Sequence, residues 1–281
     1  MSLPVTIEGK TEQIFKTSST KGPYMLGTRL VLPDGRVYKY AKSGASTITI
    51  GRIVGAQAQP AGLIIDCLGS AVQARTTAQW DAGTHTVITA TTSSATASNH
   101  ISANRYDDGY LWVTDQAGEG QMLQIKSHGI STSSGSTSVT MTMYDEELLT
   151  IALTTASQFG LVPNLYSGVV IHTGTKAGGP ALGVAPIAVA ASKYFWLQTW
   201  GPCPVCAGVA LPVAGQPVIA INTTGTSTGA TAQVAGSCYA SNSTLFVNTY
   251  LLAAVNLNIG FCLVPPTADA DFSLIFLTIS P

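Results

Sequence analysis

The stretch that decides the fold runs from Thr28 to Tyr40 and reads TRLVLPDGRVYKY. Its centre, Pro33-Asp34-Gly35, is a turn signal, because proline presets φ, aspartate caps the turn and glycine accepts a positive φ. The flanking segments 28–32 and 36–40 are rich in the apolar, β-branched and aromatic residues of strands. This stretch therefore predicts a β-hairpin.

The same strand-like pattern recurs along the chain, and no long helical stripe of apolar residues occurs. The clearest strand candidates are 47–50, 84–91, 110–114, 138–143, 194–199, 218–222, 231–234, 259–264 and 274–279. A second hairpin is predicted to pair 110–114 with 121–125. One short helix is predicted over 145–156, where acidic residues gather at the amino-terminal end. The pattern as a whole predicts a mainly β protein.

Charge divides the chain into three parts. Charged residues make up 10% of the 281 residues, against about 25% in typical soluble domains. Residues 1–52 hold eight bases and three acids, and residues 53–177 hold four bases and nine acids; beyond them only Lys193, Asp269 and Asp271 are charged. With glycine- and proline-rich breaks near 174–186, this predicts a basic arm with a hairpin (1–55), an acidic β-rich domain (56–177) and a low-charge domain (178–281). The two domains are expected to be β-sandwiches or β-barrels. The arm and the acidic part either complement each other between subunits, dock elsewhere, or never meet.

The sequence carries no secretory signal and no apolar run of the roughly 20 residues that a spanning helix needs. We therefore expect synthesis in a cytoplasm and no membrane partner. The five cysteines are expected to be free, buried thiols. They are Cys67, Cys203, Cys206, Cys238 and Cys262. Cys203-Pro204-Val205-Cys206 has a metal-like or redox-like spacing but lacks a second ligand pair and a βαβ context, so packing is the favoured interpretation and metal binding or pairing stays open.

Catalytic signatures are missing from the sequence, including the phosphate loop, the dinucleotide fingerprint and the common hydrolase motifs. The acidic pairs Asp107-Asp108 and Glu146-Glu147 have the composition of a cation site or a glycosidase pair, but adjacent acids in a turn are usually only solvated. We expect no catalytic residues, no cofactor and no metal site, hence a protein that is not an enzyme.

The densest aromatic cluster consists of Tyr194, Phe195, Trp196 and Trp200. Lys193 is the only base beside it, so the cluster lacks a nucleic-acid footprint and no direct nucleic-acid binding is expected. Packing in the core or at a subunit interface is the favoured interpretation. Stacking on the sugar rings of a glycan is the alternative.

Several segments together resemble the capsid decoration, or cement, proteins of tailed bacteriophages. The matching stretches are LGTR (26–29), PDGRVYKYAKSG (33–44), DGYLWV (108–113), GEGQM (118–122), GVAP (183–186) and YFWLQTWGP (194–202). The resemblance spans most of the chain and rests on glycine and aromatic scaffold residues. It implies a virion protein that coats the outer surface of the assembled head by binding the major capsid protein, commonly as a homotrimer. The Cys203 to Cys206 segment and the low charge near the end depart from the family pattern.

The basic arm is the predicted shell-facing element, and the low-charge domain the outward or trimer-forming one. Positive side chains would contact the shell and tyrosines would add apolar anchors, since tyrosine and arginine are enriched where interface energy concentrates. The candidate capsid-binding residues are Arg29, Arg36, Tyr38, Lys39, Tyr40 and Lys42. The alternative function is a head fibre or receptor-binding module that recognises a surface glycan through residues 194–200.

Overall fold

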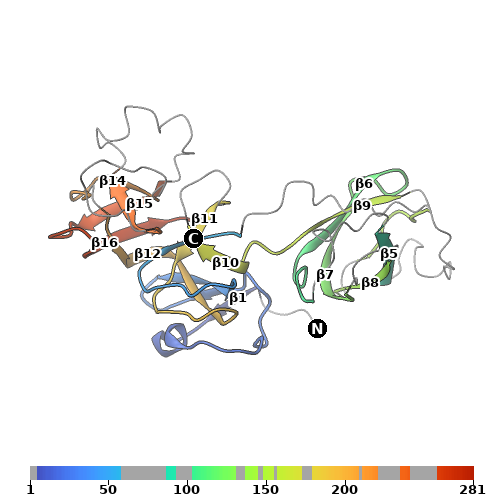
Figure 1. Cartoon of the computed structure of the whole chain (residues 1–281), viewed down its shortest axis with the longest axis horizontal. Helices are drawn as coiled ribbons and strands as arrows, with labels where there is room; N and C mark the ends of the chain where they lie inside the picture. The colour runs from blue at the N-terminus through green and yellow to red at the C-terminus, as the bar shows by residue number, and fades with distance from the viewer. Residues whose placement is uncertain are drawn as a thin grey trace. The chain divides into compact units, whose positions relative to one another are not determined.

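A computed structural model describes residues 5–57, 87–92, 103–130, 137–144, 148–154, 157–172, 179–208, 211–220, 235–240 and 258–281. In these residues the structure is almost entirely β, with one short 3-10 helix (Figure 1). The predicted mainly β fold class is therefore confirmed. The chain forms two compact units: unit 1 comprises residues 3–59 and 165–281, and unit 2 comprises residues 60–164.

Unit 1 contains one sheet of eleven described strands. Its elements are β1 (Thr6–Glu8), η1 (Thr11–Phe15), β2 (Arg29–Val31), β3 (Val37–Ser43), β4 (Ile53–Gly55), β10 (Ser167–Ile171), β11 (Ala181–Val184), β12 (Tyr194–Cys206), β13 (Pro217–Ala220), β14 (Cys238–Ala240), β15 (Asn258–Val264) and β16 (Phe272–Thr278). The strand order is β1-β2-β3-β10-β4-β11-β12-β16-β15-β13-β14, and β3 also pairs with β12. That extra pairing closes β3, β10, β4, β11 and β12 into a barrel-like ring.

The interior of this ring is an apolar core. Its buried residues are Ala41, Ile48, Val54, Ala56, Val169, Leu182, Ala185, Val189, Phe195 and Leu197. They come from both sides of the unit 2 insertion, so chain segments that are distant in sequence share one core. Burial of apolar surface is the main driving force that holds such segments together.

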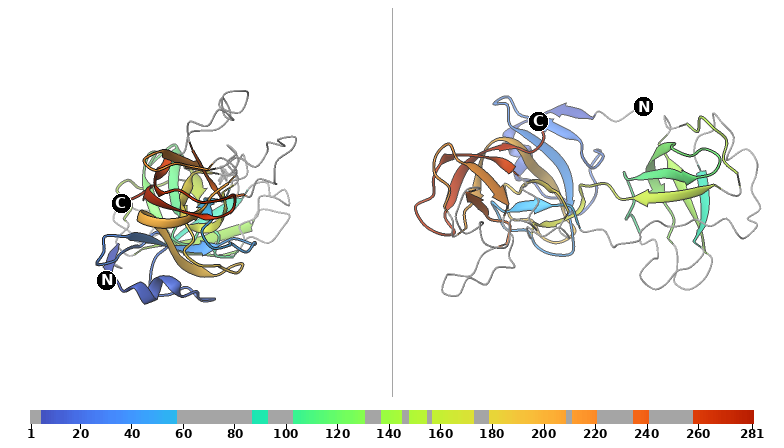
Figure 2. Two further views of the ribbon diagram at one scale, coloured as in Figure 1. Left: turned by 90° about the vertical axis from the view of Figure 1, so that its left-hand side faces the viewer. Right: turned by 90° about the horizontal axis from the view of Figure 1, so that it is seen from above.

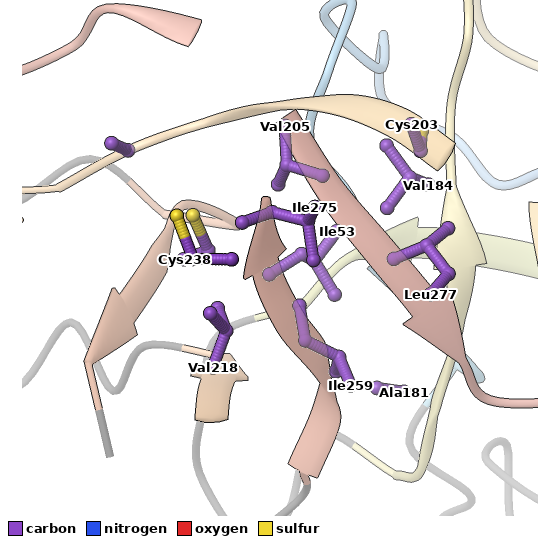
Figure 3. Close-up of a cluster of buried hydrophobic side chains, with 12 residues drawn as sticks. Ile53, Ala181, Val184, Cys203, Val205, Val218, Cys238, Ile259, Ile275 and Leu277 are labelled. Carbon is purple, nitrogen blue, oxygen red and sulfur yellow. The ribbon is translucent and has the colours of Figure 1, made fainter. Parts of the chain in front are cut away.

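β12 is the longest of the described strands and belongs to two parts of the sheet. Residues 194–200 pair with β3, and residues 200–206 pair with β16. Trp200 pairs with both strands, and the next residue, Gly201, has a φ of 87°, in the left-handed region that favours glycine; this is the bend of β12. A second core lies behind the later half of β12, where Val184, Val205, Ile275 and Leu277 converge (Figure 3).

Unit 2 is an antiparallel sheet in the order β5-β8-β7-β6-β9, drawn in green tones in Figure 2. Its strands are β5 (Val87–Thr92), β6 (Tyr110–Asp115), β7 (Met122–His128), β8 (Thr137–Met143) and β9 (Gln158–Val162). Its core consists of Tyr106, Leu111, Val113, Leu123, Ile125, Met141, Met143, Leu149, Leu153 and Leu161.

Both predicted hairpins are present. β2 pairs with β3 in the register Leu30 with Tyr38, and the turn is closed by hydrogen bonds from Leu32 N to Arg36 O and from Gly35 N to Leu32 O, each 3.0 Å. Gly35 has a φ of 83°, as the turn signal requires. β6 pairs with β7 in the same antiparallel way.

Three sequence-based expectations differ from the structure. The arm predicted over 1–55 is not a separate part, because β3 pairs with β12 of the region assigned to 178–281. Segment 47–50 is not a strand: Ile48 alone makes a bridge, to Val189. The helix predicted over 145–156 is not formed in its described part, 148–154, which consists of a bridge, bends and irregular backbone. The strand predicted at 231–234 lies outside the described residues.

Candidate functional site

The β2–β3 hairpin carries the predicted capsid-binding residues, and its pleat sends them to different places. Successive side chains of a strand point to opposite faces. In β3, Tyr38 and Tyr40 face one core, whereas Lys39 points to the other side beside Arg29, its cross-strand partner on β2. The six candidates therefore do not form one surface.

Tyr40 lies in an aromatic core. Its ring centroid is 5.1 Å from that of Trp196 and 5.7 Å from that of Tyr194, and Tyr24 packs against both Tyr40 and Trp196. The Tyr40 hydroxyl accepts a hydrogen bond of 2.9 Å from Gly22 N. Because Tyr40 is 5% exposed, it packs within the chain and is not presented as an anchor for a partner.

Tyr38 is fully buried and joins two distant parts of unit 1. Its hydroxyl accepts a hydrogen bond from Arg36 Nη1 and donates one to Gln198 Oε1, each 3.1 Å long. The Gln198 amide in turn donates to the carbonyls of Trp200 and Pro202. Burial raises the pKa of Tyr38 above its ordinary value of 10.0. Tyr38 thus connects the hairpin turn to the bend of β12.

Arg36 is already neutralised within the turn. Its Nε lies 2.7 Å from Asp34 Oδ2, and its backbone N–H donates to Asp34 Oδ1 at 3.0 Å. Burial acts to raise the pKa of Asp34, but the hydrogen bonds and the charge of Arg36 outweigh burial and hold the pKa below 3.8. Arg36 therefore fixes the turn, and little of its charge is left for a partner.

Lys42 lies on the same side of β3 as the two tyrosines. Its Nζ is 5.4 Å from the centroid of the Tyr194 ring, a cation–π arrangement.

Arg29 and Lys39, here called the basic pair, are two candidate cations without an anionic partner among the described residues; Lys42 has none there either but lies over the Tyr194 ring. Within the described part of the chain neither side chain makes an ion pair, and Arg29 Nε is buried without a hydrogen-bond acceptor. Burial lowers the pKa of Lys39, and the neighbouring charge of Arg29 lowers it further. Like charges directly opposite each other on two strands destabilise the pair. The basic pair is thus a half-buried cationic site that lacks an anion.

The predicted aromatic cluster is divided among three environments. Trp196 and Tyr194 pack with Tyr40, whereas Phe195 is 1% exposed in the barrel core. Trp200 lies at the bend of β12, directly before Gly201, where its ring meets that of Phe276 edge-on with centroids 5.7 Å apart. A glycan cannot stack on Trp196 in this conformation, because that side chain is only 5% exposed.

The cysteines are packed in the core. The four described cysteines, Cys203, Cys206, Cys238 and Cys262, are free and buried, as the sequence predicted; Cys67 lies outside the described residues. Cys203 and Cys206 stand three positions apart on an extended strand and so point to opposite faces. Burial raises the pKa of Cys238 to about 12 and also raises that of Cys203 (Figure 3). Cys203 and Cys238 therefore lack the thiolate character of a reactive or metal-binding cysteine.

The acidic pair Asp107-Asp108 is divided between two contacts. Asp108 is buried with a φ of 60°, and its Oδ1 accepts a hydrogen bond of 2.5 Å from the Tyr144 hydroxyl. Asp107 Oδ1 lies 3.7 Å from His128 Nε2. Asp108 therefore stabilises the loop that precedes β6 through its hydrogen bond with Tyr144. Glu146-Glu147 lies outside the described residues.

In the described ranges, no three His, Cys, Asp or Glu side chains are placed to hold a metal ion. The same ranges contain no helix long and apolar enough to cross a membrane. No family model, no curated protein and no solved structure matches this chain.

Sequence reasoning missed two features of this region. The first is Gln198, which lies within the quoted segment 194–202 but was given no role there, although it accepts a hydrogen bond from Tyr38. The second is the opposition of Arg29 and Lys39. The hairpin register that follows from a Pro-Asp-Gly turn was sufficient to find it.

Proposed function

We propose that this protein is a structural protein of a phage virion that decorates the outer surface of the assembled capsid and stabilises it by binding the lattice of the major capsid protein. The proposal includes a homotrimer as the bound form. It joins the resemblance of the hairpin and aromatic segments to cement proteins with one structural observation, the basic pair.

The basic pair supports the proposal because it sets two cations opposite each other beside a buried donor that has no acceptor among the described residues. Arg29 Nε is buried without an acceptor, and a buried donor without a partner costs about 1–3 kcal/mol. The pKa of Lys39 is lowered by burial and by Arg29. A carboxylate supplied by the capsid lattice would satisfy the donor and remove the repulsion between the two cations. Many copies, each bound weakly to a shell already held in place, then stabilise it together.

The test is binding to purified heads that lack the protein. The double variant Arg29→Gln/Lys39→Gln is compared with Lys10→Gln/Lys16→Gln, which removes the same charge from exposed positions. We expect at least roughly tenfold weaker binding for the first variant and near wild-type binding for the second, with strong salt dependence only where the basic pair is intact.

Deleting residues 1–52 is not a clean test, because it removes β2 and β3 and opens the ring of unit 1. Equal binding by both charge variants would refute the role of the basic pair. Electron cryo-microscopy of heads with and without the protein decides the function itself: density on the tail alone would refute decoration.

A further inference from the structure

One face of unit 1 exposes an unusual number of apolar side chains. It is the outward side of the sheet β12-β16-β15, on the opposite side from the core shown in Figure 3. The residues that define this apolar face are Trp200, Phe261, Leu263, Phe272, Leu274 and Phe276. Phe261 is 38% and Phe272 48% exposed, large fractions for phenylalanine in a folded unit.

The aromatic rings of this face form an ordered row. Phe261 and Phe276 are cross-strand partners whose rings stack with centroids 5.2 Å apart and planes at 12°. The Trp200 ring continues the row, because it packs edge-on against the Phe276 ring. The row is therefore held in place before any partner arrives, which reduces the entropy lost on binding.

The neighbouring strand edge is closed to strand addition. Cys206 N donates to Gly51 O, away from β16, so by alternation positions 202 and 204 also direct their nitrogens to that side of β12. Both positions are proline, which has no N–H to offer to an added strand. A partner of this region must pack on the face and not pair with the edge.

Charge indicates the chemistry of that partner. The six residues are uncharged, and the whole stretch 178–281 has only three charged side chains. A charged surface placed here would lose hydration without gaining a counter-charge. The basic hairpin and the acid-rich residues 53–177 are thus poor complements, whereas a second apolar sheet face is a good one, because two sheets pack flat against each other at about 10 Å.

We propose that the apolar face binds the same face of a second copy of this chain. A contact of one patch with itself is the ordinary form of a symmetric protein pair, and a formal net charge of −1 per chain opposes it little. Exposed aromatic side chains are the residue types that concentrate binding energy in such contacts. This inference does not depend on the proposed function.

Analytical ultracentrifugation of the full chain over a concentration series tests it. The variant is Phe261→Glu, which places a carboxylate in each half of the contact. The matched control is Met122→Glu on β7, a more exposed apolar strand position in unit 2. We expect the wild type and Met122→Glu to self-associate at micromolar concentration, and Phe261→Glu to raise the dissociation constant roughly 100-fold or more.

A second measurement covers the case in which Phe261→Glu fails to fold. Phe261→Cys is a milder change, and a short bis-maleimide should link its two copies, whereas M122C should not be linked. A monomeric wild type at every concentration, or self-association equally strong in folded Phe261→Glu, overturns the proposal. A wild type that stays monomeric but needs Phe261 to bind heads overturns it in favour of a docking face for the capsid.

Discussion

Tyr38→Phe removes one oxygen from the centre of unit 1 and leaves the ring in place. The lost hydroxyl is the only described contact between the hairpin side chain of Arg36 and Gln198 on β12. The substitution therefore measures what the buried hydrogen-bonded chain contributes to stability, apart from ring packing.

The expected loss is about 2 kcal/mol. Gln198 is 1% exposed, and without Tyr38 its Oε1 has no donor among the described residues. Leaving a buried acceptor unsatisfied costs about 1–3 kcal/mol. Arg36 adds little, because it keeps its ion pair with Asp34 and its side chain is 25% exposed. The carbonyls of Trp200 and Pro202 keep their bonds from the Gln198 amide.

Urea unfolding at neutral pH, followed by tryptophan fluorescence, measures this loss in the transition of unit 1. Tyr24→Phe is the matched control, since Tyr24 packs on the same aromatic core but its hydroxyl has no described hydrogen bond; we expect less than about 0.5 kcal/mol there. In a cycle with Gln198→Met, the double variant should lose less than the sum of the single losses, because the orphaned acceptor is gone. Equal stability of Tyr38→Phe and Tyr24→Phe would refute the reasoning.

Tyr38→Phe should also change how the stability of unit 1 depends on pH in the alkaline range. The pKa of Tyr38 is raised in the folded state, so the unfolded chain loses this proton first. The stability that this group contributes is complete below pH 10 and falls as the pH rises further. Tyr38→Phe should make the stability of unit 1 less dependent on pH in that alkaline range.

Three further predictions concern other parts of unit 1. Burial lowers the pKa of His172, although its hydrogen bond to Gly179 O acts in the opposite direction. The unfolded chain therefore binds a proton that the folded protein does not, and the free energy of unfolding should fall as the pH drops below 6.5. His172→Gln should reduce this pH dependence in acid titrations followed by fluorescence. Gly260→Ala should cost ~3 kcal/mol or more in urea, because a Cβ there would lie 1.9 Å from Phe276 O, whereas Gly215→Ala, with free space, should cost only the left-handed strain of ~1–2 kcal/mol. Cys238 should resist a thiol reagent in the native protein and react on unfolding, since burial raises its pKa to about 12; native labelling would contradict this.

The local parts of the fold were predictable from sequence because their causes are local. Pro33-Asp34-Gly35 sets the turn, and once the turn closes between Leu32 and Arg36, the register of the hairpin follows. The second hairpin has the same origin. Hairpins need no information from distant residues.

The closure of the ring was not predictable, because it depends on pairing between strands about 150 residues apart. Nothing near Tyr40 indicates that its partner is Trp196. Charge composition therefore misled the division of the chain: residues 1–55 differ from 178–281 in charge, yet both contribute strands to one sheet. Composition describes the surface, whereas sheet membership is decided in the core.

The missing helix has an identifiable physical reason. Leu149 and Leu153 are four residues apart and both buried, the spacing of one helical face. However, the Gln121 side chain accepts hydrogen bonds from Thr150 N at 2.7 Å and Ile151 N at 3.0 Å, and donates to Ile151 O at 3.0 Å. These bonds occupy the backbone groups that a helix would use.

The residue types of the candidate binding residues did not predict which of them are exposed. Tyrosine and arginine are frequent in interfaces, but they also suit a core with a few buried polar contacts, and the pleat of β3 places Tyr38 and Tyr40 there. Aromatic side chains that stay exposed include Phe15 beside the amino-terminal strand and, on the sheet, Phe261 and Phe272, which no sequence motif singled out. A strand of alternating apolar residues does not reveal which of its faces is covered, since that depends on what packs against it from elsewhere in the chain. For this protein the useful distinction is therefore between aromatic side chains that the chain buries and those, such as Phe261, whose rings stay partly exposed even where they stack on a neighbour.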